Sequence, residues 1–220
     1  CLLEGDSQTG VGIMAMEEGL DTGAVLLERT LDVGLLENAQ HLGQRLSELT
    51  ATLLVEALPQ IEAAGPGPES ERLQRLGVRV QSEQGMTYAR MLNKADFQID
   101  WSESALAIHR RVMGLYPGAC SSWKGKRLKL LRTEPLVERL ADQLSADGAT
   151  LAQRWRTDSQ EGHAPGTVLE LLPDLGLVVA TGGCPLLLRE GQLEGKTAAG
   201  GSSLLQQLQA QPGDQLGVHT

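Results

Sequence analysis

One carboxylate, Asp21, lies on a short turn whose composition could serve chemistry. The turn, Glu17–Gly23 (EEGLDTG), is acidic and glycine-bounded, and strand-like apolar runs flank it at Val11–Met16 and Ala24–Leu31. Asp favours turns because its side chain bonds nearby backbone groups, and Gly favours them because it accepts positive φ. Since no histidine lies near Asp21 in the sequence, the local residues alone favour a structural turn aspartate over a catalytic one.

The tripeptide Asp21-Thr22-Gly23 also matches the signature of aspartic proteases. That mechanism needs two carboxylates that share one proton, from a second motif or from a second copy of the chain. The sequence contains no other Asp-Thr-Gly or Asp-Ser-Gly, and a Leu-rich helical segment follows instead. We therefore disfavour the protease interpretation.

The charge of the chain is distributed unevenly. Its net charge is −9, but residues 1–70 carry −10, residues 71–135 carry +6 and residues 136–220 carry −5. Phosphate attraction depends on the potential within about 8–10 Å rather than on the total charge. The basic middle segment is thus compatible with a nucleic-acid partner, and equally with a solvated surface of mixed charge.

The cations of that middle segment concentrate in Lys126–Arg132 (KRLKLLR), and Lys94 and Arg110 precede it. Their partial alternation is expected to place several cations around one strand. Recognition of exposed bases also requires aromatic side chains for stacking. Aromatic residues are few, and we expect Trp101 and Trp123 to lie in the core. Contact through phosphates and shape is therefore more plausible than base reading.

The cysteine pattern and the hydropathy indicate a cytoplasmic protein without a membrane span. No apolar run approaches the roughly 20 residues that cross a bilayer. Cys1, Cys120 and Cys184 are odd in number and widely spaced, which favours a reducing cytosol over a disulfide framework. We expect Cys120 and Cys184 to be small buried hydrophobes. Neither a Cys-x-x-Cys nor a His-x-x-x-His pair occurs, so we expect no metal site.

The first part of the chain reads as two short strands followed by a long helix. Val11–Met16 is expected to be buried, and residues 37–64 carry an apolar stripe at helical spacing. Pro59 is expected to kink or separate the last helical turn. The polar, weakly patterned stretch 69–94 reads as a linker.

The second part reads as one helix followed by short strands. Ser102 is a plausible cap for that helix. Residues 139–164 are expected to form a loop, and residues 200–208 a short closing helix. Gly182-Gly183 lacks the Lys-Ser/Thr continuation of a phosphate-binding loop. The strands are typical of a small β-barrel or sandwich: 119–123, 126–136, 166–172, 176–181 and 184–190.

Three blocks of sequence resemble the methionyl-tRNA formyltransferase family. The first is Thr9–Gly23 (TGVGIMAMEEGLDTG), and the second is Thr87–Trp101 (TYARMLNKADFQIDW). The third is Ala164–Val168 (APGTV), followed by Val178–Gly183 (VVATGG) and Gly195-Lys196. Together they span nearly the whole chain in the order of the family. The combination is specific, although Asp-Thr-Gly alone is not.

The resemblance implies an α/β part followed by a β part. Residues 1–68 would form the C-terminal part of a doubly wound formyltransferase catalytic domain, and residues 69–95 a linker. Residues 96–212 would form an OB-like, tRNA-binding β-barrel domain, and residues 213–220 a tail. The family further implies a cytoplasmic monomer that uses no metal.

The resemblance also assigns a reaction and site residues. The family transfers a formyl group from the co-substrate 10-formyltetrahydrofolate to the methionine amine of initiator methionyl-tRNA. Asp21 matches the Asp of its catalytic Asn, His and Asp, with the implied task of holding and polarising the histidine. The folate-pocket loop would be Glu17, Glu18, Gly19 and Leu20, acting through backbone groups. The implied tRNA-facing residues are Lys94, Arg110, Lys126, Lys129 and Lys196.

The sequence departs from the family pattern at several points. The family's Asn and His would precede Cys1, so we expect the chain to be a fragment that shows no turnover alone. Met113 stands where many members carry Arg, and the 139–164 loop is longer than expected. Two alternatives stay open. One is another folate-dependent enzyme, either a formyltransferase acting on a sugar amine or a formyltetrahydrofolate hydrolase-like enzyme. The other is a non-catalytic RNA-binding barrel.

Overall fold

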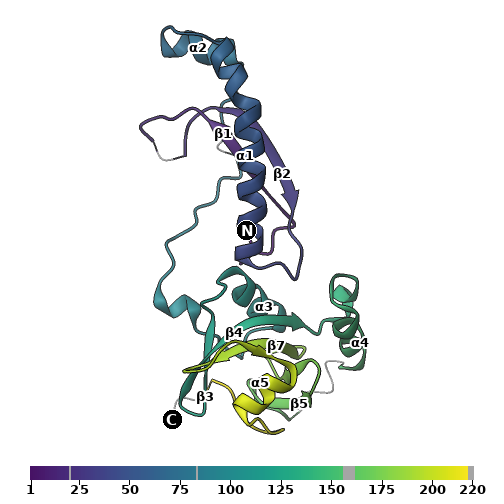
Figure 1. Cartoon of the computed structure of the whole chain (residues 1–220). Helices are drawn as coiled ribbons and strands as arrows, with labels where there is room; N and C mark the ends of the chain where they lie inside the picture. Colours follow the sequence, from purple (N-terminus) through teal and green to yellow (C-terminus); the bar gives the residue numbers. More distant parts are fainter. Residues whose placement is uncertain (20, 83, 156–161, 218–220) are drawn as a thin grey trace. The chain divides into compact units, whose positions relative to one another are not determined.

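Two units make up the chain in the computed structural model, which describes residues 1–19, 21–82, 84–155 and 162–217. The smaller unit comprises Ser7–Val33 and Gln40–Met91. The larger unit comprises Cys1–Asp6, Gly34–Ala39 and Leu92–Thr220. Figure 1 colours both along the sequence. Their later boundary, between Met91 and Leu92, falls inside the segment predicted to be a linker.

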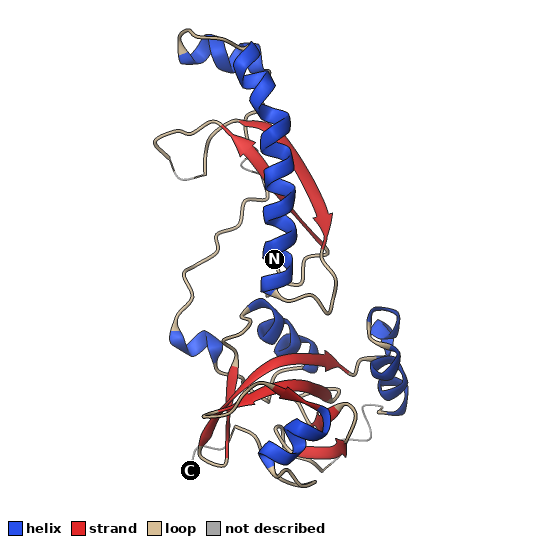
Figure 2. Cartoon of the chain, in the orientation of Figure 1, coloured by secondary structure: helices blue, strands red, loops and turns tan. Residues whose placement is uncertain are grey.

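The smaller unit is a two-stranded ribbon beside a long helix (Figure 2). The strands β1 (Gln8–Met14) and β2 (Val25–Asp32) pair antiparallel, and α1 (Ala39–Ala63) follows them. Both strands lie close to their predicted positions. Burial along β1 alternates between half-buried and exposed residues, so the prediction of a buried strand is wrong. The reason is that a two-stranded ribbon with one helix covers only one of its faces.

The helix α1 follows the predicted apolar stripe. Leu42, Leu53 and Ala57 are buried. The helix continues through Pro59 to Ala63, so the predicted separation of its last turn is wrong. Proline removes one backbone hydrogen bond, and the bonds of the other turns suffice to keep this long helix intact.

A second helix, α2 (Glu69–Leu76), occupies the start of the segment that we predicted to be a linker. It ends at Gly77, which adopts the left-handed conformation with φ +63°. Glu71 and Arg75 form an i,i+4 ion pair on it. The sequence did not predict this helix, because it has only eight, mostly polar residues. Too few apolar positions recur to reveal it.

The larger unit is built on an antiparallel sheet with the order β3-β4-β7-β6-β5, and β8 pairs with β7. All the predicted strands are present, within a few residues at their ends. The pairings of the described residues do not join β3 to β5, so they do not close this sheet into a barrel. The strands are β3 (Cys120–Trp123), β4 (Lys126–Pro135), β5 (Val168–Leu172), β6 (Gly176–Val179), β7 (Leu186–Leu193) and β8 (Ala199–Gly200).

One face of this sheet carries the main core. The helices α3 (Ala105–Gly114) and α5 (Gly201–Leu208) contribute to it, together with the short 3-10 helix η1 (Lys94–Phe97), whose Phe97 packs at its margin. The cap of α3 is Ser104 rather than the predicted Ser102. The core is mostly aliphatic, as the composition requires. Its members include Ile108, Val112, Leu128, Leu130, Leu177, Val179, Leu186, Leu188 and Leu204, and also Trp101 and Trp123, which confirms both tryptophans as core residues.

The other face of the sheet is covered by α4 (Ala146–Arg154), which lies within the predicted loop 139–164. Val178 and Leu187 face this helix, and both are fully buried. The loop prediction is wrong here because the sheet is apolar on both faces and the second face needs a cover. The short 3-10 helix η2 (Glu138–Gln143) precedes α4, and residues 156–161 of the predicted loop lie outside the described residues.

A buried ion pair fixes α4 to the sheet. Glu134 on β4 is fully buried and pairs with Arg189 on β7. Its carboxylate also accepts hydrogen bonds from the backbone N–H and the hydroxyl of Ser145, both at 2.9 Å. Ser145 is the N-cap of α4, so the Glu134 carboxylate also faces the positive end of the helix dipole.

A second buried polar group, His109 on α3, holds the segment that joins β2 to α1. Its Nε2–H donates to the carbonyl of Leu35 at 2.8 Å, and its Nδ1 accepts from the Thr133 hydroxyl at 2.9 Å. Burial lowers the pKa of His109 to about 4, although the Leu35 carbonyl and the nearby Glu134 carboxylate act in the opposite direction. Arg110 adds to the lowering. The ring is therefore neutral in the folded chain near neutral pH.

Cys120 is buried as expected, whereas Cys184 is only half-buried. Among the described residues, no helix is both long and apolar enough to span a membrane.

The depressed pKa of His109 predicts a loss of stability in mild acid. The unfolded chain protonates this histidine near pH 6.5 and the folded chain only near pH 4. The contribution of His109 to the free energy of unfolding is therefore fully present above pH 6.5 and is lost as the pH falls toward 4. From pH 7 to pH 5 the loss due to His109 is about 2 kcal/mol. Urea unfolding followed by tryptophan fluorescence measures it. A His109→Gln variant that loses as much stability over this range as the parent would contradict the assignment.

Candidate functional site

The ribbon of the smaller unit has a polar face that opens as a trough. Arg29 lies opposite Val11 and pairs with Glu56 on α1, so that set of residues faces the helix. By alternation, Gly10 and Gly12 face away from it, opposite Thr30 and Glu28. The trough encloses about 420 Å³. It is lined by Gln8, Thr9, Gly10, Val11, Gly12, Met14, Asp21, Val25, Glu28, Thr30 and Gln81.

The two glycines give the trough its depth. A Cβ atom on Gly10 would lie 2.6 Å from the carbonyl oxygen of Arg29, a distance that real Cβ atoms do not show. A Cβ atom on Gly12 would find its nearest neighbour at 3.6 Å, which is an ordinary contact. Gly10 is therefore required by the backbone, whereas Gly12 leaves space.

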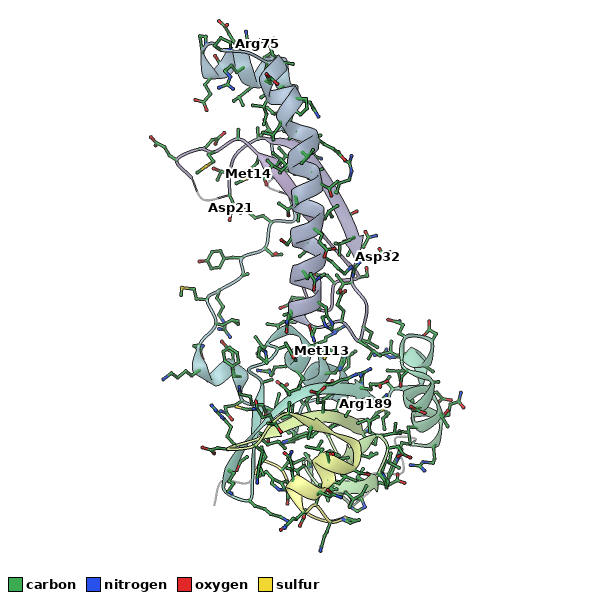
Figure 3. The ribbon with its side chains drawn as sticks, in the orientation of Figure 1. Met14, Asp21, Asp32, Arg75, Met113 and Arg189 are labelled. Carbon is green, nitrogen blue, oxygen red and sulfur yellow. The ribbon has the colours of Figure 1, made fainter. Side chains whose placement is uncertain are left out.

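Asp21 lies at one end of this trough, near Met14 (Figure 3). Its side chain is exposed, and its backbone is left-handed with φ +57°. Asp accepts this conformation more readily than most residues. The backbone of Gly23 lies so close to that of Ala15 that a Cβ atom at Gly23 would be 1.7 Å from the Ala15 carbonyl oxygen. The turn chemistry inferred from the sequence is thus present, with Asp rather than Gly in the left-handed position.

A strap of residues after α2 holds this turn from the side. Arg79 exchanges two backbone hydrogen bonds with Val25, each 2.8 Å long, and its side chain forms an ion pair with Glu28. Two residues later, the side-chain amide of Gln81 donates to the carbonyls of Asp21 at 2.9 Å and Gly23 at 2.7 Å. The sequence analysis missed Gln81, because nothing in a polar stretch marks a contact with a turn 60 residues away.

The described residues of the predicted folate-pocket loop are not part of the lining of the trough. Glu17, Glu18 and Gly19 are exposed, and Leu20 lies outside the described residues. Of the described residues that line the trough, none is a histidine or an asparagine. The structure thus places Asp21 in a cavity without showing an imidazole partner within that lining.

The smallest substitution that tests the trough adds one methyl group at each of the two glycines. Gly10→Ala should destabilise the smaller unit by about 1–3 kcal/mol, because its Cβ atom overlaps a backbone carbonyl. Gly12→Ala is the matched control and should change stability by less than about 0.5 kcal/mol. Denaturant unfolding followed by circular dichroism measures both, and equal effects of the two changes would contradict this geometry.

In the larger unit, three of the five predicted tRNA-facing cations lie at one end of the sheet. Lys126 begins β4, and Lys129 lies opposite Cys120 on β3 and Gln192 on β7. The side chain of Gln192 donates to the carbonyl of Lys196 at 3.0 Å, so the turn that carries Lys196 is fixed beside Lys129. All three lysines are exposed or half-buried.

The other two cations lie on separate elements. Lys94 begins η1, which Asn93 and Asp96 cap reciprocally, and the chain then forms a parallel bridge from Gln98 to Cys120 at the edge of the sheet. Arg110 lies on α3, and its guanidinium packs against the backbone of Gly5. The structure thus leaves Lys94 exposed on η1 and gives Arg110 a half-buried position.

No cluster suited to a metal ion accompanies these groups. Among the described residues, no three His, Cys, Asp or Glu side chains converge. The available chemistry is therefore a carboxylate at the end of a trough, and, in the other unit, a group of cations suited to phosphates.

Comparison with known proteins agrees with the motifs. Residues 91–209 match the model of the formyl transferase C-terminal domain, which is more than half of the chain, and residues 1–58 match the formyl transferase model. The chain belongs to the formyl transferase family. The family matches include both Asp21 and the cations at the end of the sheet.

Individual relatives make the likeness more specific. The chain is 67% identical over 208 residues to the methionyl-tRNA formyltransferase of Synechococcus sp. strain RCC307, covering 94% of this chain and 62% of the relative. It is 63% identical to that of strain WH7803, over 99% of this chain and 62% of the relative. The chain therefore spans a little under two thirds of the length of these relatives.

A solved structure supports the fold. HypX from Aquifex aeolicus, crystallised with tetrahydrofolic acid, aligns with a TM-score of 0.60 at 18% identity, over 94% of this chain and 31% of HypX. At this identity the likeness concerns the fold alone.

Proposed function

We propose that this chain serves in the transfer of a formyl group from 10-formyltetrahydrofolate to the methionine amine of initiator methionyl-tRNA. The observation that carries the proposal is the 67% identity to the methionyl-tRNA formyltransferase of strain RCC307, over 208 residues that include Asp21. The trough would take part of the folate, and the larger unit would bind the tRNA.

The proposed chemistry is an acyl transfer in which the amine nitrogen attacks the formyl carbon. A new C–N bond forms, the bond from the formyl carbon to N10 of the folate breaks, and one proton passes from the amine to the released tetrahydrofolate. Asp21 would hold and polarise an imidazole that moves this proton. Its exposed position at the end of the trough supports this role. Developing charge on the formyl oxygen would require hydrogen-bond donors.

The tRNA assignment rests on the local charge of the larger unit. Lys126, Lys129 and Lys196 lie at one end of an antiparallel sheet, while Trp101 and Trp123 are buried and unable to stack on bases. Phosphate contacts would therefore position the tRNA. We also propose that the sheet is OB-like, and that the protein is a cytoplasmic monomer that needs no metal.

The functional test replaces the matching stretch of the RCC307 relative with this chain, since the relative supplies the additional length. This chimaera should formylate methionyl-tRNA, and Asp21→Asn should lower kcat at least about a hundredfold. KM should change little, because Asp21 acts in the transition state. Formylation rates at varied folate and tRNA concentrations give both constants.

The matched control for this change is Glu17→Gln, which removes one negative charge from the same turn outside the lining of the trough. It should keep kcat within about twofold of the parent. Equal losses from Glu17→Gln and Asp21→Asn would mean that the charge of the turn matters and that Asp21 has no special role. An inactive chimaera would reject the proposed function.

The tRNA-facing lysines predict a change in salt dependence. For the 220-residue chain, Lys129→Ala and Lys94→Ala should each weaken binding to methionyl-tRNA and lower the slope of log K against log salt by about 1. Lys124→Ala is the control, because Lys124 already pairs with Asp214 at 2.9 Å. Filter binding at several salt concentrations measures the slopes, and unchanged slopes for Lys94 and Lys129 would refute their assignment.

A further inference from the structure

The side-chain amide of Gln81 bridges two carbonyls of the turn that carries Asp21. Its Nε2 atom lies 2.9 Å from the oxygen of Asp21 and 2.7 Å from the oxygen of Gly23. A glutamine amide has two N–H donors, so each can serve one of these carbonyls. The two acceptors flank Thr22, and the amide therefore fixes the arm of the turn that leads from Asp21 into β2.

The turn needs such support because its own conformation is costly. Asp21 holds a positive φ of 57°, which most side chains avoid. Its side chain is exposed, so packing cannot hold it in place. The base of the turn is closed by the hydrogen bond from the Ala15 N–H to the Ala24 carbonyl at 2.9 Å. Gln81 adds two further hydrogen bonds, one to the carbonyl of Asp21 and one to the carbonyl of Gly23.

The position of Gln81 is set by the strap to which it belongs. Two backbone bonds join Arg79 to Val25. Since side chains two residues apart on an extended chain point to the same side, Arg79 and Gln81 both reach the ribbon. Arg79 pairs with Glu28 and Gln81 with the Asp21 turn, and Glu28 and Asp21 both line the trough.

We propose that Gln81 is a positioning residue of the formyl-transfer site, acting through the backbone of Asp21. This inference rests on the proposed function, because it assumes that Asp21 serves the reaction. It goes beyond that function by requiring the two donors of the Gln81 amide. A residue that merely packed the strap against the ribbon would need its bulk and not its donors.

Amide hydrogen exchange of the 220-residue chain tests whether the amide holds the turn. Gln81→Met keeps the length of the side chain without donors and should speed exchange of residues 15–25 about tenfold. Gln81→Lys restores donors and should return exchange to within about twofold of the parent. The control, Gln74→Met, changes an exposed glutamine on α2 and should leave the turn unchanged. Unaltered exchange in Gln81→Met would overturn the proposal.

The chimaera with the RCC307 relative tests the catalytic consequence. Gln81→Met should lower kcat about tenfold with KM for both substrates within about twofold, and Gln81→Lys should recover most of kcat. Faster exchange with an unchanged kcat would make Gln81 purely structural and overturn its positioning role. If the chimaera with Gln81 and Asp21 intact does not formylate, the proposed function fails, while the exchange data still accept or reject the hold on the turn.

Discussion

The two-residue alternation of β1 against β2, regular from Gln8 to Ile13, is the constraint from which the site of the smaller unit follows. One set of side chains, including Val11 and Arg29, faces α1. The other set includes Gly10 and Gly12 and forms the floor of the trough. A shift of register by one residue would exchange the two faces. It would bury the polar residues against α1 and place apolar residues in the trough.

In the larger unit, β4 performs two tasks along one strand. Its first residues, Lys126 and Lys129, present cations at the end of the sheet, whereas Thr133 and Glu134 are buried. The register against β7 shifts on both sides of Arg132 between these two parts. Such irregularities re-aim side chains. The buried part then holds His109 and Arg189, so the region that presents cations is attached to a rigid polar core.

The sequence predicted those elements whose residues follow a regular pattern of apolar and turn positions. Apolar spacing identified α1, and short apolar runs between turn residues identified the strands of the larger unit to within a few residues. The sequence analysis did not single out Gly10 and Gly12, although two glycines two positions apart fall on the same face of a strand. Asp21 was found through its turn and through the family resemblance, and the structure adds that it lies at the end of a cavity.

The parts that could not be predicted depend on contacts between distant residues. The helix α4 is needed because β6 and β7 are apolar on both faces, which becomes clear only when the sheet is assembled. The ion pair between Glu134 and Arg189 joins two strands, and each residue alone resembles a surface charge. The contact of Gln81 with the Asp21 turn spans 60 residues of a polar segment that has no periodicity.

The chain fixes its polar groups in two different ways, and the difference bears on function. His109 is held by burial, which fixes its hydrogen bonds but also depresses its pKa to about 4 and keeps the ring neutral. An exposed group cannot be held in that way, because its side chain has no packing around it. The exposed Asp21 therefore has to obtain its position from the backbone, through a left-handed φ, the close approach at Gly23 and the amide of Gln81. A carboxylate held by its own main chain keeps its access to solvent, and its geometry then depends on hydrogen bonds to carbonyls rather than on the packing of its side chain.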